Sequence, residues 1–259
     1  MSTPENQLAA LLELVNEAER LHQTKLSDPG QQGASQGVKP FYTNIRAVAE
    51  HGSKLLVLGI NPGGSCSRHQ KEARAGMLTA LKDPKLRPWS AFLDEANLDA
   101  PRRNPYRSFV LQLGDQMWES REQLRIVPFG NLCPFRTPST KRRDMHADVW
   151  REGSGWGWSL IKTLQPRVLL LLGNSNSRSG WGLLREKDQF LDTSEGPRHG
   201  RTLLWKRATL VWDAENSTQV VALPHPATRL QRKVLEELES MSVDPSWAGI
   251  WAVCRSFRP

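Results

Sequence analysis

The chain has 259 residues, of which 38% are hydrophobic and 24% charged, values typical of a globular protein that can bury a full core. Its apolar runs are far shorter than the roughly 20 residues that span a bilayer, and the amino terminus lacks a signal-peptide pattern, so we expect a soluble intracellular protein, cytoplasmic in a bacterium or nuclear in a eukaryote. Three scattered cysteines argue against a disulfide framework, a Cys-based zinc site or an iron–sulfur cluster, while the net charge of +8 favours polyanionic partners.

The first half of the chain begins with apolar residues at helical spacing, which predict an amphipathic helix over residues 5–23. A glycine-bearing loop over 25–40 follows. We then expect a buried strand over 54–60, a basic, proline-broken stretch over 64–105 with a helix near 89–97, a helix over 107–119 and a strand over 124–129.

The second half begins with a basic loop over 135–145, which precedes a helix over 157–164 that ends before Pro166. An apolar strand over 167–172 leads into a Gly-Asn-Ser loop that suits a helix entry. We further expect strands over 202–205 and 209–212 that pair around Lys206-Arg207, a strand over 219–223 and a helix over 230–238.

Apolar strands that alternate with helices indicate a parallel sheet covered on both faces. We therefore predict an α/β fold: a three-layer α/β/α sandwich around a central, mostly parallel four-stranded sheet. Residues 1–259 are expected to form a single domain with an amino-terminal helical extension at about 1–40.

Three of the predicted strands end in polar side chains. Asn61 follows the first, within Gly59-Ile60-Asn61-Pro62-Gly63, Asn131 follows the second, and His225 follows the last. Ligands of open parallel sheets bind outside the carboxyl ends of the strands. Asn61, Asn131 and His225 are therefore expected to share one pocket.

Each of these residues also has a structural interpretation. The Asn61 segment could be a simple Asn-Pro-Gly turn, and its spacing matches no phosphate-binding glycine loop. The Asn131 amide could satisfy backbone groups, or it could pair with the edge of a pyrimidine and discriminate uracil from cytosine. His225, held between two prolines, could be a structural hydrogen-bonding residue or a donor that stabilises a leaving anion.

The order Gly-Ile-Asn-Pro-Gly, then Asn-x-Cys-Pro, then His-Pro-x-x-Arg resembles the uracil-DNA glycosylase superfamily. The chain looks most similar to the single-strand-selective monofunctional branch, and its first motif is also similar to that of the mismatch-specific branch. The resemblance spans roughly residues 54–232. It implies a uracil-DNA glycosylase-like fold and a DNA repair enzyme that flips a damaged base out of DNA and hydrolyses its N-glycosidic bond.

The resemblance also implies roles for residues of this chain. Asn61 would position the attacking water, and His225 would contact uracil O2 and stabilise the departing anion. Asn131 would read the uracil edge. The remaining expected contacts are to the base from Gly59, Ile60, Pro62, Gly63, Trp89 and Phe92, and to DNA from Arg229, Lys141, Arg142 and Ser175.

These roles require no metal or cofactor, and no lysine occupies a motif position for Schiff-base chemistry. The expected partner is single-stranded or mismatched DNA carrying uracil, hypoxanthine, xanthine or a related base, bound by a monomer without a membrane. The family's His-Pro-Ser-Pro-Arg-Asn is His-Pro-Ala-Thr-Arg-Leu here. A nucleic-acid-binding protein without catalysis therefore stays open as an alternative, as does a small-nucleotide-binding α/β protein.

Overall fold

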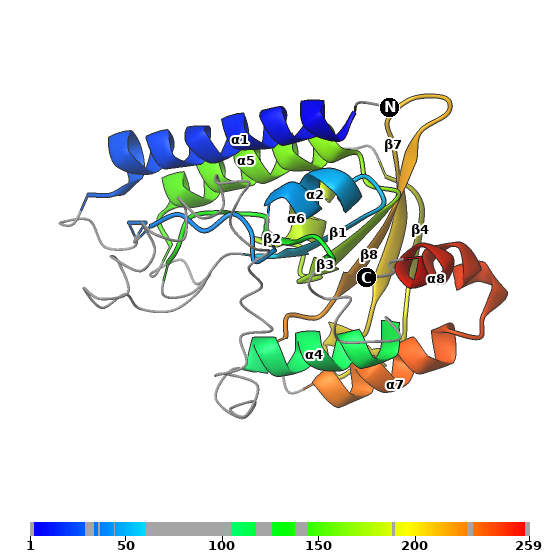
Figure 1. Ribbon diagram of the computed structural model, residues 1–259. Coiled ribbons are helices and arrows are strands. Elements are labelled where there is room, and N and C mark those ends of the chain that lie inside the picture. The colour runs from blue at the N-terminus through cyan, green and yellow to red at the C-terminus, as the bar shows by residue number, and fades with distance from the viewer. Residues whose placement is uncertain are drawn as a thin grey trace.

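The computed structural model describes residues 3–28, 34–35, 37–43, 45–60, 105–117, 126–137, 145–187, 190–226 and 230–256. Within these residues a six-stranded sheet runs in the order β2-β1-β3-β8-β7-β4 (Figure 1). The strands are β1 (Leu55–Gly59), β2 (Phe129–Asn131), β3 (Val168–Leu172), β4 (Phe190–Glu195), β7 (Lys206–Val211) and β8 (Ser217–Leu223). The first four in spatial order are parallel, β7 pairs antiparallel with β8, and β4 pairs antiparallel with β7 at the sheet edge.

The α/β class and the mostly parallel sheet are confirmed, whereas the predicted number of four strands is wrong. Two antiparallel strands extend the β8 edge, and their alternating, partly polar sequence does not form the apolar runs by which the other strands were predicted. The expected pairing of 202–205 with 209–212 is also wrong. Lys206 and Arg207 lie inside β7, which pairs with β8 and β4, while β6 (Thr202–Leu203) pairs with β5 (Arg198–His199).

The helices lie on both faces of the sheet and form two outer layers (Figure 1). One face is covered by α2 (Ile45–His51), α5 (Ala147–Leu164) and α6 (Gly180–Arg185), with α1 (Pro4–Leu21) packed against α5 and α2. The other is covered by α4 (Pro105–Met117), α7 (Gln231–Met241) and α8 (Ala248–Arg255). Short helical turns η1 (His22–Leu26) and η5 (Pro245–Trp247) follow α1 and precede α8.

The handedness of parallel crossovers explains this distribution. The chain passes from β1 to β2 in one direction along the sheet, then from β2 to β3 and β8 in the other. Because such crossovers are right-handed, reversing the direction moves the connecting helix to the opposite face. Helix α4 accordingly lies on one face and α5 and α6 on the other.

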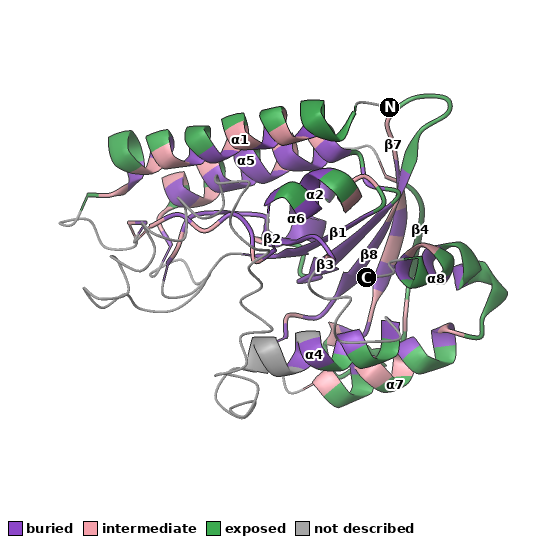
Figure 2. Cartoon of the chain, viewed as in Figure 1, coloured by how far each residue is buried: buried purple, intermediate pink, exposed green. Residues whose placement is uncertain are grey.

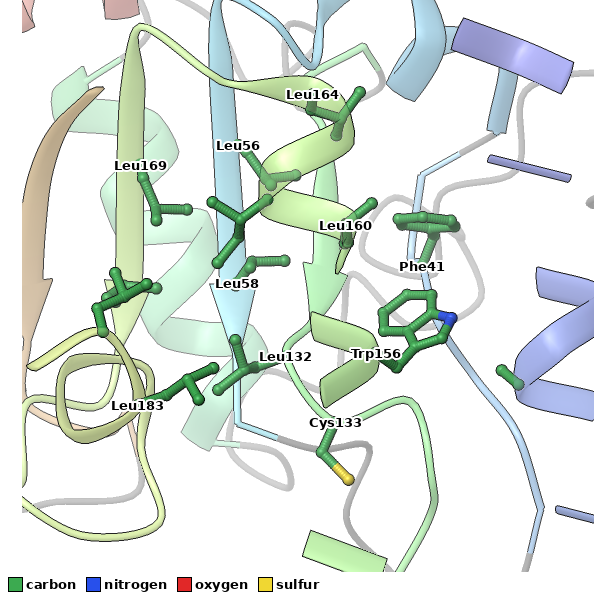
Figure 3. Close-up of a cluster of buried hydrophobic side chains, with 14 of the residues drawn as sticks. Phe41, Leu56, Leu58, Leu132, Cys133, Trp156, Leu160, Leu164, Leu169 and Leu183 are labelled. Carbon is green, nitrogen blue, oxygen red and sulfur yellow. The ribbon is translucent and has the colours of Figure 1, made fainter. Parts of the chain in front are cut away.

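Alternate residues of the central strands feed two separate cores, as Figure 2 shows by the buried inner faces of the helices. Leu56 and Leu58 of β1 pack toward α5, where Leu160 and Leu164 meet them (Figure 3). Leu55 and Val57 pack toward α4 on the other face. All residues of β1 and β3 are buried, as a strand covered on both sides requires.

Several predicted elements are confirmed with shifted bounds. The helix expected over 157–164 begins earlier, at Ala147, where the His146 side chain accepts a hydrogen bond from the backbone of Asp148. The second strand is short and lies at Phe129–Asn131, because Ile126–Pro128 form a turn and coil ahead of it. The helix expected near 89–97 lies outside the described residues.

The edge strand β4 is interrupted by a register shift between Leu191 and Ser194. Asp192 occupies the left-handed region there, with φ 51°, which a non-glycine residue adopts rarely. The shift is a β-bulge, a device that bends a strand and ends regular pairing.

Candidate functional site

A pocket of about 390 Å³ lies at the carboxyl ends of β1, β3 and β8. Ile60 contributes from the end of β1, Gly173 and Asn174 from the end of β3, and Pro224 and His225 from the end of β8. The chain leaves β1 toward β2 and reaches β3 on the other side, so the sheet order changes direction between β1 and β3. Ligands of open α/β sheets bind at such a switch point.

The ends of β1 and β3 approach each other closely in the pocket wall. Gly173 has a φ of 152°, and a Cβ placed on it would lie 2.9 Å from the Ile60 Cδ1 atom. A larger residue would therefore displace Ile60 or the loop that follows β3. Glycine at this position therefore allows the ends of β1 and β3 to lie close together in the pocket wall.

Asn174 presents a buried amide in the same wall. Its side chain is 8% exposed, and its Nδ2 donates to the Leu203 carbonyl oxygen at 2.8 Å. Because Nδ2 points toward Leu203, the Oδ1 atom of the amide points away from it. The Oδ1 atom has no bonded donor among the described residues, so it is an available acceptor for a ligand N–H.

His225 is held in a short, restrained loop. Pro224 and Pro226 fix φ on either side, and the Gln231 Nε2 atom donates to the Pro226 carbonyl oxygen. Burial lowers the pKa of His225 below its ordinary value of 6.5, because the charged imidazolium would lose solvation. The imidazole is therefore neutral at pH 7 and can donate one N–H.

The outer wall of the pocket is basic. It carries Arg198, Arg201 and Lys206, which come from the segment between β4 and β8, and one carboxylate, Glu195. Ser175 also lines the pocket, with its hydroxyl bound to the Ser177 carbonyl oxygen at 2.6 Å. This wall favours an anionic ligand group.

Asn131 lies at the end of β2 and is 1% exposed, but it does not line this pocket. Its Nδ2 atom donates to the Lys39 carbonyl oxygen at 2.8 Å, and its side chain also hydrogen-bonds to the Tyr42 hydroxyl. The Lys39 ammonium lies 4.2 Å above the Tyr42 ring, and burial with repulsion from Arg136 lowers the Lys39 pKa to about 8. The Asn131 amide thus satisfies groups of the protein itself.

The structure brings together Ile60, Ser175 and His225 of the residues predicted from sequence. Gly59 ends β1 next to Ile60 but does not line the pocket, and its carbonyl oxygen accepts from the Leu132 backbone N–H at 2.8 Å. The other predicted contacts lie outside the described residues: Asn61, Pro62, Gly63, Trp89, Phe92, Lys141, Arg142 and Arg229.

Sequence reasoning missed Asn174 and the basic wall. Asn174 follows an apolar strand and a glycine, which is the same signal that marked Asn61, so the strand-end rule could have found it. Arg198 lies in β5 and Arg201 in the turn between β5 and β6, a two-stranded hairpin that no apolar pattern predicts. Among the described residues, no cluster of three or more His, Cys, Asp or Glu side chains could hold a metal ion.

In comparisons with known proteins, no protein-family model matches the chain and no curated protein is significantly similar to it. Within the described residues, no helix combines the length and the apolar character needed to cross a membrane.

Proposed function

We propose that this protein is a monofunctional DNA glycosylase with a uracil-DNA glycosylase-like fold, which hydrolyses the N-glycosidic bond of uracil or a related deaminated base. The observation that carries the proposal is one pocket at the switch point of the sheet, lined by Ile60, Asn174 and His225. Ile60 directly precedes Asn61, and His225 belongs to the His-Pro-x-x-Arg motif, so two of the three motifs lead to this pocket.

The chemistry available in the pocket suits departure of an anionic base. A flipped base is unstacked at a cost of a few kcal/mol, which is smallest in single strands and mismatches. Cleavage ahead of water attack gives an oxocarbenium-like sugar and a base anion. The neutral His225 imidazole donates to that anion, and Asn61 directs the water.

Base selectivity is assigned to an amide oxygen. Uracil and hypoxanthine carry a ring N–H at the position where cytosine and adenine, the bases from which they arise, have an acceptor nitrogen. Xanthine shares its ring N–H with guanine, so this contact discriminates only against cytosine and adenine. The resemblance gives the reading role to Asn131, whose amide is bound within the protein, and the pocket geometry gives it to Asn174. Asn174 Oδ1 accepts from the ring N–H and rejects an acceptor in that position.

The test is release of free base from single- and double-stranded oligonucleotides that contain uracil, hypoxanthine or xanthine. His225→Ala should lower the rate by about 10²–10³-fold, the usual cost of one preorganised donor. His51→Ala is the matched control, because His51 is also a partly buried imidazole with a lowered pKa but ends α2, near the opposite end of β1. The proposal fails if the wild type releases none of these bases and Asn61→Ala changes nothing.

The second candidate is a nucleic-acid-binding protein that uses the same pocket without cleavage. The Asn131 hydrogen bonds favour it, because they remove one expected base contact from the pocket. Salt-sensitive binding of DNA without release of any base would support this candidate over the glycosylase.

A further inference from the structure

A second hollow adjoins the His225 pocket. This hollow has a volume of about 340 Å³ and is lined by Trp181, Arg185 and Phe190, among others. The two hollows share three wall residues, Asn176, Glu195 and Lys206. We call the two adjoining hollows together the basic groove.

The basic groove has an excess of positive charge. Arg185, Arg198, Arg201 and Lys206 line it against a single carboxylate, Glu195. Glu195 pairs with Arg198 at 3.6 Å, and both side chains are at least half exposed, so this pair contributes little to stability. Among the described residues no carboxylate lies within 4.0 Å of the charged groups of Arg185, Arg201 or Lys206.

Lys206 is the most informative of these cations because it is only 6% exposed. Its ammonium donates to the Asn176 Oδ1 atom at 2.9 Å and lies 5.3 Å from the centre of the Trp181 ring. An ammonium has three donors, and the described residues give this one a single acceptor. Because Lys206 lines both hollows, its remaining N–H groups are available to an anionic ligand group there.

We propose that the basic groove binds the sugar–phosphate backbone of a single DNA strand whose target base enters the His225 pocket. The proposal rests on the proposed function, since it extends the same pocket. Each hollow has the volume of a small-molecule site, which is enough for a nucleotide unit of one strand. A positively charged groove that follows the backbone is how proteins hold single strands without reading their sequence.

The experiment measures binding of a fluorescent, uracil-free oligothymidylate over a range of salt concentrations. Arg201→Ala should reduce the slope of log K against log salt by about 0.7, the value for one phosphate contact with a single strand. The double variant with Arg185→Ala should reduce it by about twice as much. Arg167→Ala is the matched control, because Arg167 is also an exposed arginine but precedes β3, at the opposite end of the sheet. The salt slope of this variant should equal that of the wild type.

Glu195→Gln provides a test of opposite sign. Removal of the one carboxylate should tighten oligothymidylate binding by roughly two- to five-fold, since an exposed charge interaction has that size. A variant that merely damaged the fold would weaken binding instead.

The outcomes separate this proposal from the glycosylase. The groove is not a strand site if the arginine variants keep the wild-type salt slope, even if base release is normal. The same conclusion follows if thymidine monophosphate binds as tightly as the oligonucleotide. Reduced slopes in a protein that releases no base would support the groove and contradict the glycosylase.

Discussion

The His225 imidazole lies between two prolines where β8 ends, and burial lowers its pKa below 6.5. Below that pH the unfolded chain takes up a proton that the folded site resists. His225 therefore contributes to a loss of stability that begins as the pH falls through 6.5 and is absent above it. Above that pH the imidazole is neutral, and in this form it serves as the hydrogen-bond donor of the proposed reaction.

This linkage can be measured directly. The imidazole of His225 should titrate with a midpoint below 6.5 by NMR. Urea unfolding at about pH 7 and about pH 5 should show that His225→Gln loses less stability on acidification than the wild type. A midpoint at or above 6.5 would show that burial does not dominate at this residue.

The hydrogen-bond partner of the Asn131 side chain could not be predicted from the sequence. Its strand-end position was predicted nearly correctly, yet its amide bonds to the Lys39 carbonyl oxygen, 92 residues away along the chain. No local pattern encodes such a partner. Ile60 and His225 could be placed because strand ends of a parallel sheet share one edge, and that rule needs no knowledge of side-chain partners.

Helix α5 packs tightly against the end of β2 through a glycine. A Cβ on Gly157 would clash with the Leu132 carbonyl group, with the carbonyl carbon only 2.9 Å away. Gly157→Ala should therefore lower the free energy of unfolding by about 1–3 kcal/mol, as overpacking does. This cost should appear in urea denaturation midpoints.

Gly155, two residues earlier on the same helix, is exposed and has nothing within 4 Å of its Cβ position. Gly155→Ala should raise the free energy of unfolding by about 0.5–1 kcal/mol, because alanine favours the helix. Equal effects of the two substitutions would show that α5 does not contact Leu132 as described.

The elements differ in how far the sequence reveals them. The strands β1, β3 and β8 were predicted within two residues because β1, β3 and the second half of β8 are apolar runs buried on both faces. In contrast, β7 begins with Lys206 and Arg207, which resemble a turn, although Lys206, Ala208 and Leu210 alternate toward the buried side. Burial of Lys206 depends on Asn176 and Trp181, which pattern alone does not place beside it.

At the scale of the whole molecule, the amino-terminal helix belongs to the main core. Leu11, Val15 and Ala18 of α1 are fully buried, and the Trp156 indole N–H of α5 donates to the Leu14 carbonyl oxygen at 2.7 Å. Helix α1, which belongs to the helical extension expected at about 1–40, therefore packs as part of the helical layer over the sheet.

Leu11→Ala should consequently lower the stability of the entire fold by about 2–5 kcal/mol and shift one cooperative transition. Circular dichroism and tryptophan fluorescence should report the same shifted midpoint. Two transitions, of which only one moves, would mean that α1 unfolds independently of the sheet.

The irregular strand β4 has a consequence for self-association. A long, straight strand at the border of a sheet offers its unpaired backbone groups to other chains and promotes aggregation. The bulge at Asp192 breaks that ladder, and the exposed Leu191 beside it is 56% accessible. A chain lacking this irregularity would present Leu191 on a continuous border, where neighbouring copies could dock strand to strand.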